Sequence, residues 1–525
     1  MPVSMPVSMP VSTTVLTTGS GRSRAVRRAA LAALAAVTLA GPVALGHPAQ
    51  AAPVVRDPAV RATTGSAAAS QAGLTSKLSS ILNDSRSRKE TDVSVLDAET
   101  GAVVYSRRAT SASLPASNTK ILTAVAAMDV LGPDYRFSTD VVRRGEVSDG
   151  VLHGSLYLVG HGDPTSRQSD YAALAAQVRA AGITEVTGRI VADGSFFDDQ
   201  RYNPGWSTSY ASEYYAAQTA ALTVAPNADY DTGTVIVKVK GGSRGHRPTL
   251  STTPAAAKAY VHLVNQASTT GSTSVSLSRK AGGSTITVRG HVRSGRTWSG
   301  LVTVDKPELY AAAVFRRELE RQKIDVEGGT RLGTTPASKR TRVARDTSMT
   351  LSKLLVPFLK LSNNLHAEAL TKTMGALDGR PGSWPSGLRR TTTALDDLGV
   401  PLKGVTLTDG SGVTRRNRVT PLALTRTLVE VRDKAWWPAF DAALPVAGVD
   451  SHWVGGTLRH RMNGTRAADN AHAKTGSLTG VTALSGYVTG RDGRRYAFSM
   501  LSTYAGSTPR PVENEVVVAL AGWRG

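Results

Sequence analysis

Two side chains with complementary acid–base chemistry stand three residues apart, Ser117 and Lys120, in the run Leu114-Pro-Ala-Ser-Asn-Thr-Lys120. Apolar residues at helical spacing follow the lysine as far as Leu131, which predicts a buried helix beginning near the serine. Since positions i and i+3 share a helix face, we expect the ammonium to lie beside the hydroxyl. A desolvated lysine can lose its proton and act as a base, and a helix start offers free N–H groups to an oxyanion. Ser-x-x-Lys also arises by chance, so the pattern needs support from elsewhere in the chain.

A second polar motif, Ser362-Asn363-Asn364, interrupts a helical stretch between Leu351 and Met374. The Ser362 hydroxyl can relay a proton, and the Asn364 amide has a donor and an acceptor with which to orient an amide substrate. We therefore expect this break between two helices to face the same site.

The third motif, Lys474-Thr475-Gly476-Ser477, precedes a strand predicted from Val481 to Val488. The lysine offers positive charge to a carboxylate. Gly476 allows the backbone to approach a ligand closely, and Ser477 can supply an N–H group to an oxyanion. The motif therefore predicts a carboxylate-binding edge of the site.

Length and cysteine content limit the possible chemistry. At 525 residues the chain is long enough for several domains and a full hydrophobic core. It contains no cysteine, which excludes disulfides, thiolate metal sites and cysteine nucleophiles. We expect neither a cofactor nor a metal in the site.

The N-terminus has the pattern of an export signal. Four arginines between residues 22 and 28 precede an apolar run, Ala29 to Leu45, and Ala49-Gln50-Ala51 fits the small-x-small cleavage rule. The run is short for a spanning helix, although a permanent N-terminal anchor is the alternative interpretation. Residues 1–51 are therefore predicted to be a signal peptide cleaved near Ala52, which places the mature protein outside the cytoplasm, in the cell wall.

The chain is strongly basic, with a formal charge of +22. Removal of residues 1–51 takes away four arginines and no acid, which leaves 58 basic and 40 acidic residues, a charge of +18. Such a charge suits peripheral association with anionic wall polymers or an anionic membrane surface. The basic residues are dispersed along the sequence without a nucleic-acid-binding motif, so we expect no nucleic-acid partner.

The residue pattern of the sequence changes along the chain, and these changes predict inserted domains. Strand-like segments begin near residue 137, alternating Thr, Ser, Gly and Val dominate between about 228 and 295, and helical segments return near 346. The predicted parts are a signal peptide (1–51), a linker (52–73), a domain with all three motifs (74–136 plus 346–525), an inserted domain II (137–225 plus 297–345) and an inserted β-rich domain III (226–296).

Together, the order and local context of the three motifs resemble the signature of penicillin-binding proteins and serine β-lactamases. The 245-residue separation of Ser117 and Ser362 is similar to that in low-molecular-mass class C penicillin-binding proteins, which are D-alanyl-D-alanine carboxypeptidase/endopeptidases with domains inserted there. The resemblance covers about residues 74 to 525, without a specific match over 228–295. Four further stretches resemble the same family: Gly160 to Thr165, Asp409 to Gly412, Leu444 to Gly448 with Gly456 to Leu458, and Lys474 to Tyr487.

The resemblance implies an α/β (α+β) fold, with an antiparallel sheet flanked by helices as in β-lactamases and transpeptidases. It also implies that Ser117 is the nucleophile and that Lys120 is its general base. The backbone N–H groups of Ser117 and Ser477 would form the oxyanion hole. The remaining implied roles are proton transfer to the leaving amine by Ser362, substrate amide binding by Asn364, and binding of the terminal carboxylate by Lys474, Thr475, Gly476 and Ser477.

The resemblance also concerns the residues that select the side chain of the stem peptide. In the family, residues after Asp-Gly-Ser-Gly line the pocket for the peptide side chain, which indicates Val413 and Arg415 here; a surface arginine is the alternative for Arg415. The middle motif has Asn363 where many relatives carry Asp, at a position without a catalytic role. The aromatic loop from Gly205 to Tyr215 lacks an aspartate that some relatives use, and Glu213 can replace it. We expect the aromatic residues of this loop to belong to a core rather than to a ligand wall.

Three functions are compatible with these patterns. The first is a DD-peptidase that cleaves D-alanyl-D-alanine bonds of peptidoglycan stem peptides, including D-Ala-meso-diaminopimelate cross-links, and is acylated by β-lactams. The second is a serine β-lactamase or esterase, against which the long insertion and the lack of a deacylating Glu motif argue. The third is a non-catalytic wall-binding protein, against which three intact motifs argue. The balance of carboxypeptidase and endopeptidase activity stays open.

Overall fold

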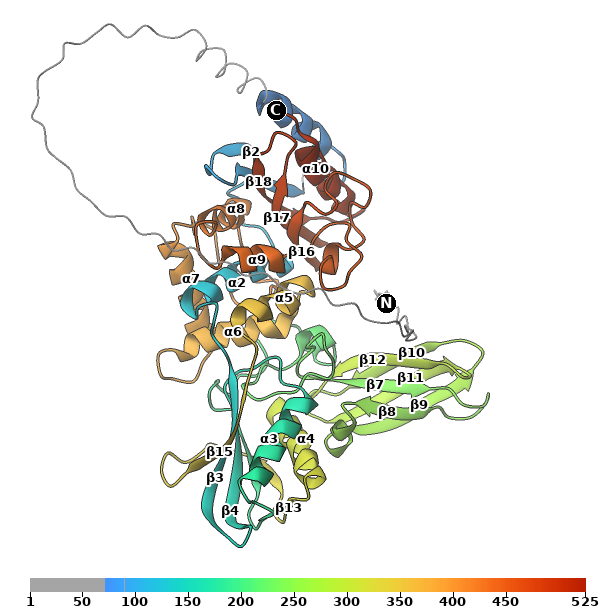
Figure 1. Ribbon diagram of the computed structural model, residues 1–525. Coiled ribbons are helices and arrows are strands. Elements are labelled where there is room, and N and C mark those ends of the chain that lie inside the picture. The colour runs from blue at the N-terminus through green and yellow to red at the C-terminus, as the bar shows by residue number, and fades with distance from the viewer. Residues whose placement is uncertain (1–70, 89) are drawn as a thin grey trace, which may run out of the picture. The chain divides into compact units, whose positions relative to one another are not determined.

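The computed structural model describes residues 71–88 and 90–525 (Figure 1). The predicted signal peptide and the first 19 residues of the predicted linker lie outside the described residues. A helix over residues 71–82 occupies the end of the linker and the start of the motif-bearing region. In the part of the chain that the structure describes, every helix is too short or too polar to cross a membrane.

A five-stranded antiparallel sheet joins the two ends of the described chain, in the order β16-β17-β18-β1-β2. Thr91 of the first strand pairs with Ser502 of the last strand along the chain, so residues more than 400 positions apart are neighbours. The strand predicted from Val481 to Val488 is confirmed as β17. The strands are β1 (Thr91–Asp97), β2 (Val103–Arg107), β16 (His472–Leu478), β17 (Val481–Thr489) and β18 (Arg495–Thr503).

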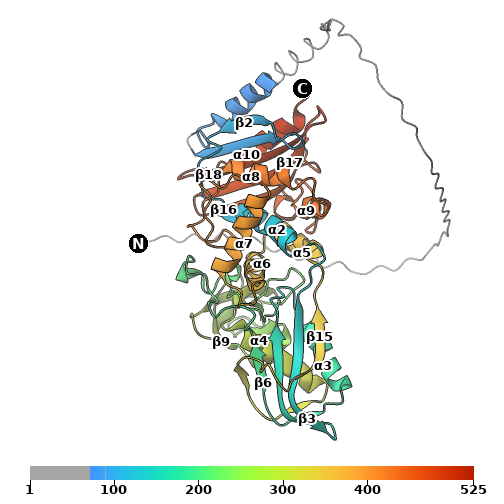
Figure 2. The same ribbon diagram turned by 90° about the vertical axis from the view of Figure 1, so that its left-hand side faces the viewer.

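Helices cover both faces of this sheet. The helix over 71–82 and α10 (Arg510–Gly522) pack on one face, where Leu484 and Phe498 belong to the same buried cluster as these helices. On the other face lies α8 (Pro421–Glu430), visible in front of the sheet in Figure 2. Small residues there, such as Ala483, allow α8 to lie close to the strands. Full burial of a large apolar side chain stabilises the fold by about 1.5–3 kcal/mol, so both layers contribute substantially.

A group of buried helices continues from the α8 face. Its central element is α2 (Thr119–Val130), in which every residue from Ile121 to Met128 is buried. The predicted interruption near Ser362 is confirmed, since one helix ends at Lys360 and the next begins at Asn364. The others are α5 (Leu351–Lys360), α6 (Asn364–Ala376), α7 (Trp384–Asp397) and α9 (Trp437–Ala443).

The chain between α2 and α5 forms separate sheets. The larger has seven strands, in which β3 and β15 pair antiparallel and lie side by side in both ribbon views (Figures 1 and 2). Two helices, α3 (Gln168–Ala180) and α4 (Pro307–Arg321), pack with it. The strands are β3 (Ser138–Ser148), β4 (Val151–Gly160), β5 (Glu185–Val186), β6 (Ile190–Asp193), β13 (Asp325–Val326), β14 (Thr330–Leu332) and β15 (Thr341–Thr347).

Two three-stranded sheets form what we call the β7–β12 module. Their valine-rich faces, which include Val237 and Val288, share one buried cluster. The strands are β7 (Thr234–Lys240), β8 (Thr249–Thr253), β9 (His262–Thr270), β10 (Ser274–Arg279), β11 (Thr285–Arg293) and β12 (Thr297–Thr303). Because β12 pairs with β7 from Thr297 to Thr303, the module extends beyond the predicted domain boundary at residue 296.

Candidate active site

Ser117 lies in a single 3-10 turn, η1 (Ala116–Asn118), immediately before α2. Ala116 has a φ of +45°, in the left-handed region, so the chain turns sharply before the serine. Lys120 follows in the first turn of α2, and its Nζ donates a hydrogen bond of 2.9 Å to Ser117 Oγ. The predicted pairing of the two side chains on one helical face is therefore confirmed in geometry.

Lys120 is fully buried and has three oxygen acceptors. Besides Ser117 Oγ, its Nζ donates to Asn364 Oδ1 at 2.6 Å and to the Ser411 carbonyl at 2.7 Å. Burial lowers the pKa of Lys120 to about 7, although the carboxylates of Asp409 and Glu368 oppose this shift. A neutral fraction is therefore available near neutral pH to accept the Ser117 proton.

The second motif occupies the link between α5 and α6. Ser362 has a φ of +61°, which turns the chain sharply there. Asn363 Oδ1 accepts from Leu365 N at 3.1 Å and so caps α6, a role that Asp fills equally well. Asn364 Nδ2 donates to the Tyr215 carbonyl at 2.6 Å. Its amide retains one donor and one acceptor position beyond the contacts to Lys120 and Tyr215.

Lys474 lies within strand β16, so the motif precedes the predicted strand, β17, as expected and is itself part of a strand. Its Nζ donates to Ser362 Oγ at 2.8 Å and to the Thr475 carbonyl at 2.8 Å. Burial, together with the positive charge of Lys120, lowers the pKa of Lys474 well below its usual value. The five residues predicted to act in catalysis thus form two hydrogen-bonded groups. Lys120 joins Ser117 and Asn364 in the first, and Lys474 pairs with Ser362 in the second.

Gly476 has a packing role that differs from the predicted one. A Cβ at this position would lie 2.8 Å from Asn118 Nδ2 and 2.9 Å from the Pro115 carbonyl oxygen. The absence of a side chain at Gly476 therefore lets β16 pack closely against the η1 turn of the protein itself, and not only against a ligand. This contact sets the separation between Ser117 and the edge strand.

The remaining residues of the third motif are more exposed. Thr475 Oγ1 lies 2.8 Å from Thr457 Oγ1, and Ser477 Oγ accepts from Arg510 Nη2 at 3.1 Å. Arg510 begins α10, far from the motif in sequence, and no local pattern indicated it. The edge of the site therefore carries a half-buried cation in addition to the buried Lys474.

Val413 joins the aromatic loop in one apolar cluster. It is 7% exposed and Trp206 is 5% exposed, and both belong to one buried cluster with Ala216. Tyr214 is 49% exposed, so the expectation that the loop's aromatic residues are core holds only in part. The exposed Arg415 donates to the Thr479 carbonyl, which leaves both interpretations of this residue open.

Glu368 is a site residue that the sequence analysis missed. It is fully buried on α6 and accepts hydrogen bonds from the backbone N–H groups of Gly410 (3.0 Å) and Ser411 (2.9 Å). Trp384 Nε1 donates to it at 2.7 Å. Burial and the nearby negative charge of Asp409 raise the pKa of Glu368. Its spacing of four residues from Asn364, on the same helix face, was the available signal.

Asp409 organises the Asp-Gly-Ser-Gly loop. Its carboxylate accepts from the N–H groups of Gly412 and Thr414, each at 2.8 Å, and from Trp206 Nε1 at 2.8 Å. A Cβ at Gly412 would lie 1.8 Å from the Ala116 carbonyl oxygen, so this loop lies directly against the η1 turn. The loop therefore presents the Ser411 carbonyl to Lys120 in a fixed position.

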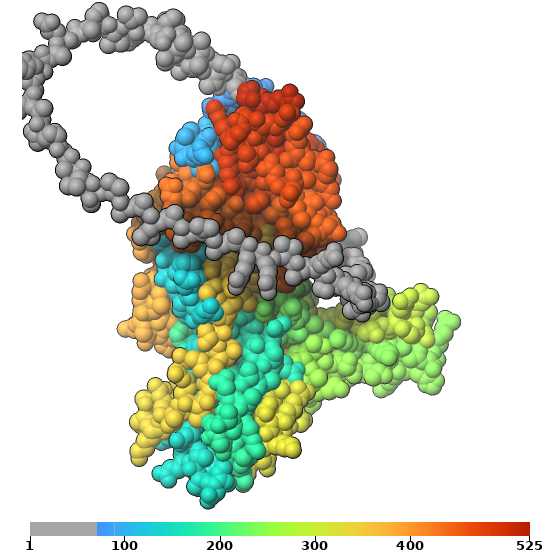
Figure 3. Space-filling model, viewed as in Figure 1, coloured from blue at the N-terminus to red at the C-terminus, as the bar shows by residue number. Residues whose placement is uncertain are grey.

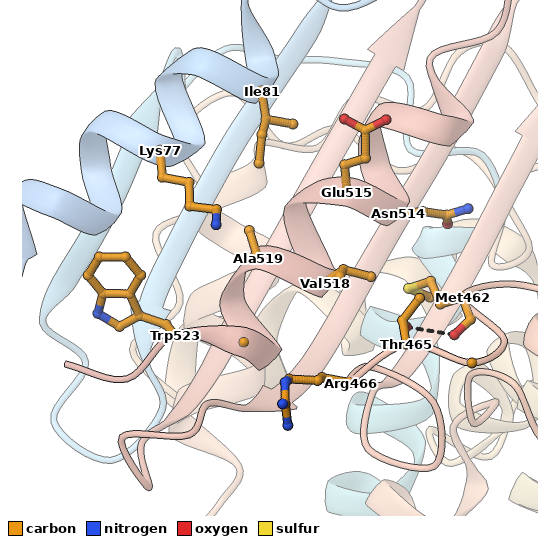
Figure 4. Close-up of a pocket in the computed structure, with 12 residues that line it drawn as sticks. Lys77, Ile81, Met462, Thr465, Arg466, Asn514, Glu515, Val518, Ala519 and Trp523 are labelled. Atoms are coloured by element: carbon orange, nitrogen blue, oxygen red, sulfur yellow. Dashed lines mark hydrogen bonds between the residues drawn. The ribbon is translucent and has the colours of Figure 1, made fainter.

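A large hollow lies away from the three motifs. A groove of about 1100 Å³ runs between the helix over 71–82 and α10, lined by Lys77, Val518 and Trp523 among others (Figure 4). None of the motif residues lines it. Within residues 71–88 and 90–525, no group of three or more His, Asp or Glu side chains is placed to hold a metal ion.

Comparisons with known proteins find similar sequences over most of the chain. The sequence profile of the D-Ala-D-Ala carboxypeptidase 3 (S13) family matches residues 74–523. The chain is 40% identical over 446 residues to a D-alanyl-D-alanine carboxypeptidase from Actinomadura sp. (strain R39), covering 82% of this chain and 81% of that protein. It is 27% identical over 395 residues to the D-alanyl-D-alanine carboxypeptidase DacB of Haemophilus influenzae, covering 73% of this chain and 79% of that protein.

Among solved structures, penicillin-binding protein 4 (dacB) from Haemophilus influenzae superposes with a TM-score of 0.71 at 24% sequence identity. The superposition covers 84% of this chain and 98% of that chain. At this identity the likeness concerns the fold, and it supports the α/β fold expected from the sequence.

A first prediction concerns the loop held by Glu368. Glu368→Gln replaces one acceptor oxygen by a donor that faces backbone N–H groups, so it should lower the free energy of unfolding by about 1–3 kcal/mol. Hydrogen exchange of a peptide covering residues 409–412 should become faster in the folded protein. Denaturant unfolding and exchange mass spectrometry measure the two effects.

The matched control is Glu513→Gln in α10. This change removes a buried carboxylate that pairs with Arg461 at 3.0 Å. It should cost comparable stability without changing exchange over 409–412. Unchanged exchange in the Glu368 variant would show that the loop is held by other contacts.

Proposed function

The chain belongs to the D-Ala-D-Ala carboxypeptidase 3 (S13) family, the serine-type carboxypeptidases of peptidoglycan, and we propose that it cleaves D-alanyl-D-alanine bonds through an acyl-enzyme on Ser117. The observation that carries the proposal is the 2.9 Å contact between Ser117 Oγ and the buried Lys120 Nζ. A lysine whose pKa lies near 7 is suited to remove the serine proton.

Acylation follows from this pair. Neutral Lys120 accepts the Ser117 proton as Oγ attacks the carbonyl carbon of the penultimate D-alanine. The N–H groups of Ser117 and Ser477 stabilise the oxyanion that forms. The Asn364 amide holds Lys120 in place through Oδ1 and uses its remaining positions for the substrate amide.

Collapse of this intermediate breaks the peptide bond and requires a proton for the leaving amine. Ser362 supplies it, and the Lys474 ammonium 2.8 Å away can replace the proton that Ser362 loses. Before deacylation, the proton that Lys120 took from Ser117 is lost to solvent and Lys474 regains one from solvent. Neutral Lys120 then accepts a proton from water as the water attacks the acyl-enzyme, and this proton returns to Ser117 Oγ as the shortened peptide is released. The lowered pKa of Lys474 makes proton donation to Ser362 easier.

The terminal carboxylate of the substrate would bind at the edge of β16. Thr475 and Ser477 offer hydroxyl groups there, and the buried Lys474 offers its positive charge from the interior of the site. An incoming carboxylate would raise the pKa of Lys474 and so restore that charge. Arg510, beside Ser477, is a second cation that can attract the same group.

The cluster of Val413 with the aromatic loop would form one wall of the pocket for the stem-peptide side chain, with Arg415 and Glu213 at its exposed border. The apolar wall would contact the methylene portion of a long side chain, and the two charged residues would meet its polar end. The width of the pocket at this border would decide whether the enzyme acts mainly as a carboxypeptidase or as an endopeptidase.

We infer that the protein acts outside the cytoplasm and is inhibited covalently by β-lactams. The family's peptidoglycan substrate supports the first inference, together with the predicted signal peptide 1–51. A structure of the Haemophilus influenzae protein complexed with a β-lactam supports the second. We also propose a division into a catalytic region (74–136 plus 346–525), an inserted region of seven strands, and the β7–β12 module.

A second prediction tests the nucleophile. Wild-type protein incubated with penicillin should gain the mass of one acyl group that persists for hours, and Ser117→Ala should gain none while remaining folded. Intact mass spectrometry measures both. Rapid release of the acyl group would favour a β-lactamase, and absence of an adduct on wild type would favour a non-catalytic wall-binding protein.

A third prediction concerns pH. Since the protonated form of Lys120 cannot accept a proton, the acylation rate should rise about tenfold per unit below pH 7 and level off above it. The rate of penicilloyl-enzyme formation between pH 5.5 and 8.5 measures this limb, with circular dichroism to verify folding at each pH. A flat profile would exclude Lys120 as the base that limits the rate.

A fourth prediction concerns Lys474. Lys474→Gln should cost about 2–4 kcal/mol of transition-state stabilisation for a peptide ending in D-Ala-D-Ala, which is roughly 30- to 800-fold in kcat/KM. A thioester substrate without the carboxylate should lose much less. Steady-state kinetics on both substrates decide this, and equal losses would assign Lys474 to proton transfer.

Arg510→Gln serves as the comparison, because it removes a half-buried cation from the same edge. A charge that keeps contact with solvent contributes about 0–1 kcal/mol, so its loss should reduce kcat/KM for the peptide by less than about sixfold. A larger loss than that of Lys474→Gln would make Arg510 the main carboxylate anchor.

A further inference from the structure

One segment of the chain contains basic residues and no acidic ones. Residues 232–304, which include all strands of the β7–β12 module, hold ten of the 62 Lys and Arg residues and none of the 40 Asp and Glu residues. In the rest of the segment 71–525 there are 46 basic and 39 acidic residues, an excess of seven. The module thus carries more than half of the positive excess of residues 71–525.

The fold gathers part of this charge at one end of the module. The chain enters at Thr234 and leaves at Thr303, which are directly paired in the β7–β12 ladder. The seven residues of β7 extend about 20 Å from there, at about 3.3 Å per residue. Figures 1 and 3 show the module extending from the rest of the described chain. The loops at the far end are therefore separated from both points of attachment.

Three loops meet at this far end and are joined by backbone hydrogen bonds. Gly241 N donates to the Arg296 carbonyl at 2.9 Å, which ties the loop after β7 to the loop after β11. Gly245 N donates to the Thr269 carbonyl and Ser294 N to the Thr270 carbonyl, each at 3.0 Å, which ties both loops to the end of β9. The far end is therefore a connected surface rather than three independent loops.

This surface, which we call the basic tip, carries five exposed cations: Lys240, Arg244, Arg247, Arg293 and Arg296. Across residues 71–88 and 90–525, no carboxylate pairs with any of the five, and their side chains donate no hydrogen bond to the protein. The five come from two segments about 50 residues apart in sequence. Their charge is therefore fully available to a ligand.

The chemistry of the tip favours a repeating anion. Four of its five cations are arginines, whose planar guanidinium groups bind phosphate oxygens in pairs. Cations grouped on one surface suit a chain with a phosphate at each repeat, because each bound phosphate releases counterions. Charge complementarity alone would also admit an anionic membrane. Of the exposed large hydrophobic residues in the described chain, however, only Val264 lies in the module, and it is on β9 rather than at the tip.

We propose that the basic tip binds a linear phosphodiester polymer of the cell wall and so holds the enzyme at its insoluble substrate. The tip touches none of the motif residues, so binding there and peptide cleavage are separate functions. Failure of this proposal would leave the assignment of Ser117 and Lys120 unaffected.

The test uses the full-length mature protein and a five-residue variant, Lys240→Gln, Arg244→Gln, Arg247→Gln, Arg293→Gln and Arg296→Gln. A control variant removes the same charge from other exposed positions: Lys339→Gln, Arg340→Gln, Arg342→Gln, Lys353→Gln and Lys403→Gln. The probe is immobilised poly(glycerol phosphate), titrated at 50 and 200 mM salt. Penicillin acylation of each protein verifies that the active site is intact.

Wild type should bind the polymer, and its affinity should fall steeply with salt. The tip variant should bind at least tenfold more weakly and with a shallower salt dependence, while the control variant should lose less than threefold. Equal losses in both variants would mean that only net charge matters, and unchanged binding in the tip variant would place the polymer elsewhere. Tighter binding of wild type to vesicles with an anionic phospholipid, at equal phosphate concentration, would make the partner a membrane. Each of these three results would overturn the proposal.

Discussion

The buried ammonium of Lys120 is the constraint on which the site depends. A charge without access to water is costly unless it is hydrogen-bonded, and the fold supplies three oxygen acceptors from three separate segments. These are the Ser117 hydroxyl, the Asn364 amide and the Ser411 carbonyl. The same burial lowers the pKa of Lys120 to about 7, so the cost of placing the lysine there is also the source of its basicity.

Helix α6 connects that constraint to the rest of the molecule through one face. Asn364, Glu368 and Lys372 follow one another at intervals of four residues, which places them in a row. Asn364 contacts Lys120, and Glu368 holds the Asp-Gly-Ser-Gly loop. The buried Lys372 pairs with Asp198 at 2.6 Å and lies 4.0 Å from the centre of the Trp384 ring. The inserted region therefore contacts the helix that aligns the site, both there and where Tyr215 accepts from Asn364.

The two functions inferred for this chain depend on charged groups in different environments. In the site, two lysines are buried and their pKa values are lowered, so their protons can move. At the basic tip, five cations are exposed and unpaired among the described residues, so their charge persists at all physiological pH values. Such a separation would let a charged surface hold the enzyme at the wall without disturbing the proton transfers at Ser117.

The sequence by itself determined the motif residues, their order, the helix break at Ser362 and the strand after the third motif, because these depend on local periodicity and residue chemistry. Only the tertiary structure decided that Lys474 lies inside a strand, that Gly476 packs against the η1 turn, and that Glu368 supports the loop beside Lys120. It likewise brought basic residues dispersed in sequence onto one tip. The physical reason is that desolvation, close packing and loop contacts depend on residues hundreds of positions apart, which no local pattern encodes.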